Sequence, residues 1–393
     1  MAFDLIEIVD RRAIAGAAAT HALVIGVSHY RHFDGGADPT PTGQQWGMRQ
    51  LTAAAGSATA VAAWLATDYR NKRAPLGSLR VLVSPRPDDT LDPLIAPHVA
   101  NNTATRANVE TALDELFAAC KSNPDSVAIV YIAGHGVQMT RDGAVVLLED
   151  AGDGNEIAAL RGAIDAMACR NGMNRAASAN TQFWFIDACR EEASYQKQFE
   201  YMAGALEIDA PKTPFAQSSH CFLAASTGQQ AFARPKGRTL FCEALLESLR
   251  TALVGPGPGC SSWHVSSQTL GAALQDRVRT LAAEKRAIQN VFPLTSGMQN
   301  VVFHQIDGTP EVEVTIAIDP EEAAATSRGE LALNGEAKRA VVLEGPWPAK
   351  TRVEQGLYIL RVTSRSTYRE RVQPIAVNPP SVVLAVALEK DSR

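Results

Sequence analysis

Two apolar runs with the composition of buried strands each lead directly into a residue that could do chemistry. The run Val127–Gly134 leads to His135, and the run Thr181–Ala188 leads to Cys189. In a parallel α/β sheet the functional side chains gather at the carboxyl ends of such strands. A cysteine nucleophile with a histidine base is the minimum set for covalent attack on an acyl carbon. The two motifs therefore predict nucleophilic thiol chemistry from His135 and Cys189.

The flanks of His135 favour a functional histidine over one that merely closes a core strand. Gly134 precedes it and Gly136 follows it. Glycine lets the backbone bend sharply and approach another chain closely, and a structural histidine rarely needs it on both sides.

Sequence position separates Cys189 from the other cysteines, because a single cysteine is most often inert core packing. Cys169 is the instructive comparison, since Ala168–Arg170 repeats the tripeptide Ala188–Arg190 but follows a helical pattern. Cys189 instead follows a strand directly. We assign a structural role to the remaining five cysteines, which are Cys120, Cys169, Cys221, Cys242 and Cys260. Their scatter, without CxxC spacing, argues against a zinc site or a disulfide framework and favours a reducing cytoplasm.

Strand-like and helix-like segments alternate from about residue 20 to residue 305. The expected strands cover 22–26, 79–84, 127–134, 144–148, 181–186 and 220–225, and the expected helices cover 51–65, 108–119, 157–167 and 241–249. This alternation predicts an α/β fold, a mostly parallel sheet flanked by helices on both faces. A hairpin and a crossover helix fit between the His135 and Cys189 strands, so the two strands can be neighbours.

The pattern changes near residue 306, which divides the chain into predicted domains 1–305 and 306–393. After Asp307–Pro310 the residues alternate with period two in Glu311–Ile318, and Asn334–Gly335 is a hairpin signal. Further strands are expected at 330–333, 340–343, 357–362, 368–377 and 382–388. We expect a small C-terminal antiparallel β-sandwich that serves as a structural or partner-binding module.

The length and charge of the chain indicate what kind of protein this is and which partners it can have. The 393 residues suggest two domains, and 46% hydrophobic with 20% charged residues is ordinary for a globular protein. A net charge of −5 with no dense basic stripe gives no case for nucleic acid. The first ten residues carry acids where a signal peptide needs bases, and no apolar run approaches a membrane span. We expect a cytoplasmic protein that binds neither nucleic acid nor membrane.

These motifs resemble the caspase-like cysteine peptidases (family C14, clan CD), nearest the prokaryotic metacaspase-like or orthocaspase group. His135 lies about 50 residues upstream of an x-A-C-[RQG] motif at Cys189, as in caspases. Residues 51–65 resemble the family's first helix, L-x-G-A-x-N-D-A-x-x-V-A-x-x-L. Residues 222–231 and 237–249 resemble the small-subunit strand and its helix, so the resemblance spans roughly residues 20 to 305.

The resemblance implies the caspase-like (caspase-hemoglobinase) fold and hydrolysis of peptide bonds in protein substrates. Cys189 would attack the scissile carbonyl to form a thioester, and His135 would assist both proton transfers. The family's oxyanion hole, built from backbone N–H groups, maps to Gly136 and Cys189.

The same resemblance places two residues in the pocket for the substrate's P1 side chain. Asp187, two residues before the nucleophile, matches the acid that selects Arg or Lys; its alternative role is to fix the loop by accepting backbone N–H bonds. Ser57 stands where the family has the acid of N-D-A, which weakens the basic preference. Specificity for aspartate at P1 would instead need an arginine pocket, for which Arg49 is the candidate near this region.

Two polar stretches leave alternatives open. Residues 191–219 contain Lys197 and Lys212 and match the region cut during caspase activation, but they also suit an ordinary exposed loop. The acidic residues of 149–156 could bind calcium, as in some metacaspases, yet they lack EF-hand register and also suit an acidic turn. We therefore predict no cofactor, with calcium as the open alternative.

The leading hypothesis is a bacterial caspase-like endopeptidase in regulated proteolysis, for stress or antiviral defence, with a protein activator or partner bound by the C-terminal domain. One alternative is a catalytically silent caspase-fold scaffold, against which the intact His135 and Cys189 pair argues. Another is a non-peptidase thiol hydrolase of small amides or esters.

Overall fold

The computed structural model describes residues 16–40, 48–137, 143–153, 162–175, 178–189, 218–226, 231–233, 237–257, 260–297, 300–336 and 340–391. The chain forms two compact units, the first from Met1–Ser248 with Leu270–Phe303 and the second from Leu249–Thr269 with His304–Arg393. The division at Phe303 lies close to the boundary expected at residue 306. The second unit also takes up Leu249–Thr269, which the sequence pattern placed in the first domain.

A six-stranded sheet in the order β11-β8-β7-β3-β1-β2 forms the centre of the first unit. Its strands are β1 (Thr20–Val27), β2 (Leu76–Ser84), β3 (Val127–Gly134), β7 (Thr181–Ala188), β8 (Ser218–Leu223) and β11 (Phe292–Ser296). All neighbours pair in parallel except β11, which joins the edge antiparallel to β8. Strands β3 and β7 are buried along almost their whole length, which explains their unbroken apolar sequences.

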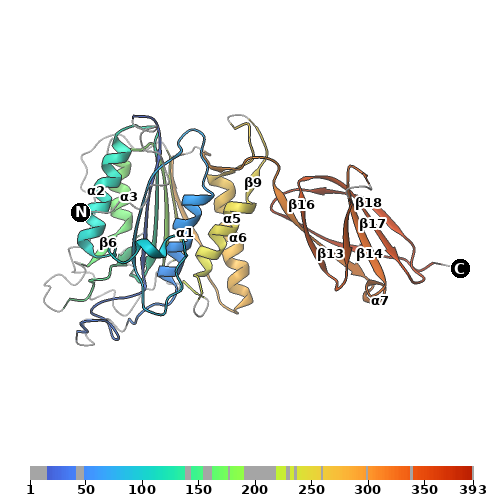
Figure 1. Ribbon diagram of the computed structural model, residues 1–393, viewed down its shortest axis with the longest axis horizontal. Helices are drawn as coiled ribbons and strands as arrows, with labels where there is room; N and C mark the ends of the chain where they lie inside the picture. Colours follow the sequence, from blue (N-terminus) through green and yellow to red (C-terminus); the bar gives the residue numbers. More distant parts are fainter. Residues whose placement is uncertain are drawn as a thin grey trace. The chain divides into compact units, whose positions relative to one another are not determined.

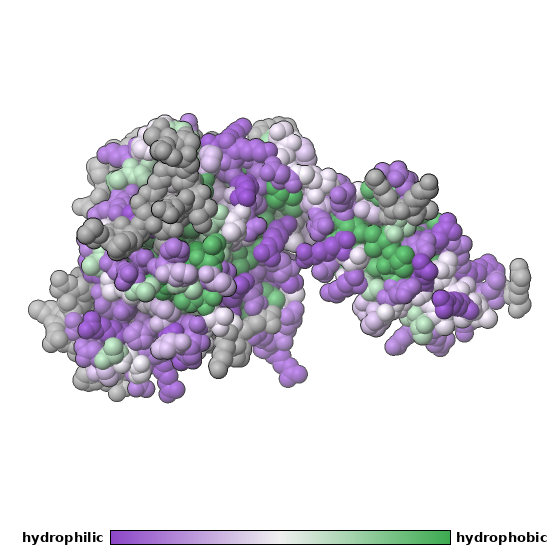
Figure 2. Space-filling view, in the orientation of Figure 1, coloured by the Kyte–Doolittle hydropathy of each residue, from purple (hydrophilic) through white to green (hydrophobic). Residues whose placement is uncertain are grey.

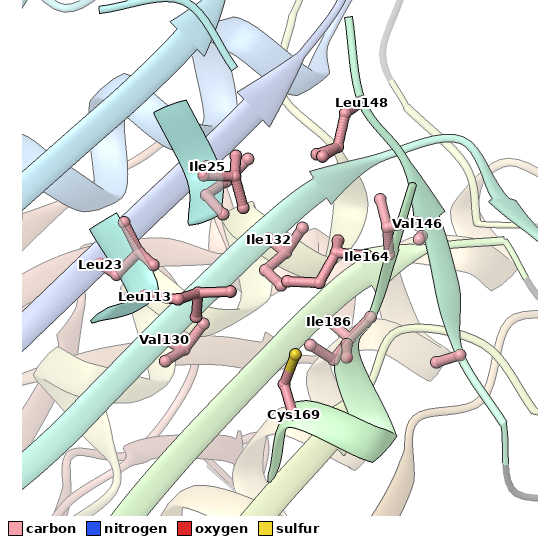
Figure 3. Close-up of a cluster of buried hydrophobic side chains, with 14 of the residues drawn as sticks. Leu23, Ile25, Leu113, Val130, Ile132, Val146, Leu148, Ile164, Cys169 and Ile186 are labelled. Carbon is pink, nitrogen blue, oxygen red and sulfur yellow. The ribbon is translucent and has the colours of Figure 1, made fainter. Parts of the chain in front are cut away.

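Helices cover both faces of this sheet (Figure 1). On one face lie α1 (Ala54–Thr67), α5 (Leu240–Thr251) and α6 (Ser267–Glu284), and on the other lie α2 (Arg106–Lys121) and α3 (Ala166–Arg175). A short 3-10 helix, η3 (Ala96–His98), follows β2. The core cluster in Figure 3 joins Leu23 and Ile25 of β1 to Val130 and Ile132 of β3 and Leu113 of α2. The predicted α/β architecture is confirmed, although α6 and β11 were not predicted.

The connection between β3 and β7 is a small antiparallel sheet followed by α3. Its strands are β4 (Gly136–Val137), β5 (Val145–Leu147) and β6 (Ala163–Asp165). The prediction of a helix over 157–167 is wrong at Ile164, because Ile164 pairs with Val146 in this sheet and the helix begins only at Ala166. Ile157 and Leu160 lie outside the described residues.

The second unit contains two sheets, β15-β14-β17-β18 and β16-β13-β19, packed around one apolar core. The strands are β13 (Glu311–Asp319), β14 (Ser327–Leu333), β15 (Val341–Glu344), β16 (Ala349–Glu354), β17 (Gly356–Ser364), β18 (Arg371–Val377) and β19 (Ser381–Ala387), with a short helix α7 (Glu321–Ala324). The expected small antiparallel sandwich has one parallel pair, since β19 runs parallel to β13. The chain enters β19 from β18 of the other sheet, so β19 need not run antiparallel to its new neighbour.

A third, three-stranded sheet consists of β9 (Leu253–Val254), β10 (His264–Ser266) and β12 (Val302–Gln305). Across the described ranges, no helix combines the length and the apolar character needed to cross a membrane. The first fifteen residues, and the stretch that holds Lys197 and Lys212, lie outside the described residues.

Candidate active site

His135 and Cys189 occupy equivalent positions at the ends of two adjacent parallel strands. The β3–β7 register ends with Gly134 opposite Ala188, so each chemical residue is the next one along its strand. Both side chains are half-buried. The structure therefore brings the imidazole and the thiol to one edge of the sheet.

Hydrogen bonds fix both the backbone and the ring of His135. Its backbone N–H donates to Tyr30 Oη at 2.7 Å, and its Nε2 lies 2.6 Å from the carbonyl oxygen of Arg49. A carbonyl oxygen can only accept, so we assign the hydrogen to Nε2. In the neutral ring Nδ1 is then the nitrogen without a hydrogen and is the atom able to take a proton.

Two residues that the sequence motifs did not single out, Tyr30 and Gln50, hold this arrangement. Gln50 binds both backbone groups of Tyr30, because its Oε1 accepts from Tyr30 N at 2.6 Å and its Nε2 donates to Tyr30 O at 2.8 Å. The fully buried Tyr30 ring lies against His135, with centroids 5.0 Å apart. Burial raises the pKa of Tyr30, so it stays a neutral phenol. The one available signal was that Tyr30 follows a strand end closely.

Arg49 contributes its carbonyl group to His135, and its side chain is exposed.

The thiol of Cys189 has backbone partners. The N–H of Ala231 donates to Cys189 Sγ at 3.3 Å, and Sγ lies 3.8 Å from the carbonyl oxygen of Ala231.

Gly136 contacts the backbone of the cysteine motif so closely that no other residue fits. A Cβ built there would lie 2.8 Å from Ala188 Cβ and even closer to Cys189 O, a separation that real Cβ atoms essentially never show. Glycine at this position therefore allows the main chains of the two motifs to touch.

Asp187 is a buried carboxylate with only one of its oxygens satisfied. Its side chain is 2% exposed, and Oδ2 accepts from Tyr131 Oη at 2.6 Å and from Thr239 Oγ1. Its Oδ1 has no hydrogen-bond partner within the described part of the chain. Desolvation raises the pKa of Asp187 to about 6, and the two hydroxyl bonds partly oppose that shift. Both donors are side-chain hydroxyls, whereas the loop-fixing alternative expected backbone N–H groups.

Thr239 joins Asp187 to Ser57, although the two lie on different elements. Ser57 is buried on α1, and its Oγ accepts from the backbone N–H of Thr239 at 3.0 Å. The hydroxyls of Ser57 and Thr239 lie 3.3 Å apart. Thr239 stands one residue before α5, inside the segment that carries the family resemblance, but no motif singles it out. Cys242, nearby on α5, is buried, and burial raises the pKa of its thiol to about 12.

Two of the described acidic residues of 149–156, Glu149 and Asp150, have structural partners. Glu149 Oε2 accepts from Ser84 Oγ at 2.6 Å, and the Asp150 carboxylate accepts from Arg106 N at the start of α2. Glu156 lies outside the described residues. In the described ranges, no three His, Cys, Asp or Glu side chains gather in a way that could hold a metal ion.

Cys169 has the surroundings of a packing residue. It is fully buried on α3 and belongs to the core cluster with Ile186 (Figure 3). Its neighbour Arg170 is also buried, and its guanidinium donates to neutral oxygens at the sheet edge, namely Ser219 Oγ and O, Leu294 O and Ser296 Oγ.

Residues 19–253 match the family model described as the caspase domain, peptidase family C14. Over 256 residues the chain is 26% identical to the uncharacterized protein y4kE of Sinorhizobium fredii, covering 64% of this chain and 72% of that protein. Among solved structures it is similar to caspase-1 from Spodoptera frugiperda, with 12% identity and a TM-score of 0.42, over 73% of this chain and 90% of that one.

Proposed function

Because the chain belongs to the caspase domain family of cysteine peptidases, we propose that it is an endopeptidase with Cys189 as nucleophile and His135 as proton carrier. One observation carries the proposal. The two residues follow in-register positions of adjacent parallel strands, and the carbonyl of Arg49 on Nε2 leaves Nδ1 as the basic atom.

The reaction follows from that arrangement in two halves. Nδ1 of His135 takes the thiol proton, Cys189 Sγ bonds to the scissile carbonyl carbon, and the C–N bond breaks as the imidazolium returns the proton to the leaving amine. In the second half His135 removes a proton from water. The resulting hydroxide breaks the thioester, and the proton returns to the thiol.

The tetrahedral oxyanion in each half needs fixed hydrogen-bond donors. We assign this role to the backbone N–H groups of Gly136 and Cys189. The close approach at Gly136 supports the assignment, because the main chains of the two motifs meet there without a side chain between them. Removing one such donor typically costs about 2.7–4 kcal/mol of transition-state stabilisation.

We assign P1 specificity for Arg or Lys to Asp187. A buried carboxylate with one unsatisfied oxygen is unstable by itself, and a guanidinium or ammonium group would supply both the missing donor and the opposite charge. Ser57 supports this pocket indirectly, through Thr239. Because Ser57 is neutral, Asp187 is the only carboxylate among these three residues.

We propose that the second unit binds a protein activator or partner and that hydrolysis serves regulated proteolysis in bacterial stress or defence signalling. Apolar residues gather on the visible face of this unit among hydrophilic ones (Figure 2). Among its described residues, the exposed large apolar side chains are Val254, Val342, Leu357, Val372 and Val383. The signalling role and a cytoplasmic location rest on the family and on the free thiol.

Fluorogenic peptides that vary only at P1 test the proposal, with and without calcium. We expect wild type and Cys169→Ala to cleave after Arg or Lys, and Cys189→Ala and His135→Ala to be inactive. Cys169→Ala is the matched control, because it removes the thiol from the same Ala-Cys-Arg tripeptide in the core. Activity retained in Cys189→Ala would refute the nucleophile, and cleavage after Asp would refute the role of Asp187.

A further inference from the structure

The segment Ala231–Ala233 lies beside the nucleophile and is held at several points. Ala231 N–H donates to Cys189 Sγ at 3.3 Å. The carbonyl of Phe232 accepts from Leu240 N at the start of α5 at 2.9 Å, and Ala233 forms an antiparallel bridge with Thr239. The segment thus connects the cysteine thiol to the residue that binds Asp187.

The side chain of Gln289 also holds this segment. It is 1% exposed, and its Oε1 accepts from Phe232 N at 2.9 Å while its Nε2 donates to Ala224 O at 2.9 Å. Ala224 directly follows β8, and its own N–H donates to Ile186 O of β7. The amide has one donor side and one acceptor side, so only one orientation makes both bonds. Gln289 therefore ties the segment to the sheet that carries Cys189.

We propose that Gln289 is a positioning residue that keeps the Ala231 N–H on Cys189 Sγ, where this hydrogen bond stabilises the thiolate. The inference rests on the proposed role of Cys189 as nucleophile. The segment carries no charge, so its effect comes from the direction of one backbone dipole.

The geometry favours the thiolate over the thiol. A hydrogen bond to an ionised acceptor is roughly twice as strong as one to a neutral acceptor, so the N–H···S bond strengthens when the thiol loses its proton. The carbonyl oxygen of Ala231 opposes this, but it lies 3.8 Å from Sγ, whereas the N–H nitrogen lies at 3.3 Å. The closer dipole end is the positive one, so the contact with Ala231 favours the thiolate.

Alkylation of Cys189 by iodoacetamide as a function of pH tests the proposal without needing peptidase activity. The labelled peptide is identified by mass spectrometry, which separates Cys189 from the buried cysteines. Ala231→Pro removes the N–H, and Ala231→Gly is the matched control that keeps it. Gln289→Met keeps the size of the side chain without its amide.

We expect the thiol pKa of Cys189 to rise by about one unit in Ala231→Pro and in Gln289→Met. At pH values below the wild-type pKa, Cys189 should then be alkylated about tenfold more slowly than in wild type. Ala231→Gly should retain the wild-type profile. In peptide hydrolysis kcat should fall while KM changes little, because the bond acts on the nucleophile and not on substrate binding.

An unchanged alkylation pKa in both Ala231→Pro and Gln289→Met would overturn the proposal. Faster labelling or higher activity in these variants would also overturn it, since the segment would then block the thiol. Failure of the proposed function gives a separate result: Cys189→Ala would retain peptidase activity, whatever the alkylation profiles of the other variants.

Discussion

Replacing Asp187 by Asn tests two properties of this buried carboxylate separately: its cost to the stability of the fold and its role in recognising a basic P1 residue. Burial raises the pKa of Asp187 from 3.8 to about 6 in the folded protein. Between these values the folded state binds more protons than the unfolded state, so stability falls as pH rises through this window. Above the folded pKa the whole penalty is present, and a shift of about two units corresponds to about 3 kcal/mol.

Asparagine carries no such penalty, because it does not ionise. Its oxygen can still accept from Tyr131 and Thr239, and its amide nitrogen takes the place of the unsatisfied Oδ1, at a cost that does not depend on pH. The stability difference between Asp187→Asn and wild type should therefore shift in favour of the variant by about 2–3 kcal/mol from about pH 4 to about pH 7.5. All other ionisable groups are shared and cancel.

Urea unfolding at a series of pH values measures this difference, and kcat/KM for peptides with P1 Arg and P1 Leu measures the function. We expect Asp187→Asn to lose at least about 10²-fold of the preference for Arg, because the guanidinium loses its buried counter-charge. A stability difference that stays flat with pH would refute the reasoning about burial. An unchanged Arg preference would refute the role of the carboxylate in the pocket.

Three further substitutions probe the support of the site. Gly136→Ala places a Cβ against Cys189 O. We expect kcat in peptide hydrolysis to fall by about 10²–10³-fold, and the free energy of unfolding in urea to fall by about 1–3 kcal/mol. Tyr30→Phe removes the hydroxyl that accepts from the backbone N–H of His135. We expect the free energy of unfolding to fall by about 1–3 kcal/mol and kcat to be lower. Wild-type values in both assays would contradict a role for this hydrogen bond. Arg170→Met removes the donor that binds Ser219, Leu294 and Ser296. We therefore expect thermal unfolding to show a stability lower by about 1–3 kcal/mol, with KM unchanged.

The elements and the chemical pair could be predicted because their signals are local. A strand buried on both faces must be apolar along its length, so β3 and β7 are visible as runs of sequence. Where such runs end in His135 and Cys189, the parallel arrangement brings the ends together. The prediction failed at Ile164 because an apolar residue beside a helix start suits a strand equally well, and pairing with Val146 decided between them.

The supporting residues could not be predicted, because each acts through a bond between segments that are distant in sequence. Gln50 reaches the backbone of Tyr30, Thr239 joins Ser57 to Asp187, and Gln289 holds Phe232. A single Gln or Thr leaves no periodicity or motif, and its partner is a backbone group that every residue has. Only the folded chain shows which of these contacts exist.

The two Ala-Cys-Arg tripeptides show most clearly what the sequence determines and what only the tertiary structure decides. Sequence context alone distinguished them, because Cys189 follows a strand and Cys169 a helical pattern. The tertiary structure decided the surroundings of each residue. Cys169 lies in the apolar core, and Arg170 binds oxygens at the edge of the sheet. Cys189 accepts a hydrogen bond from a backbone N–H, and its strand lies next to the strand that leads to His135. Identical residues differ here because hydrogen bonding and burial are properties of the surroundings, and the surroundings are assembled from distant parts of the chain.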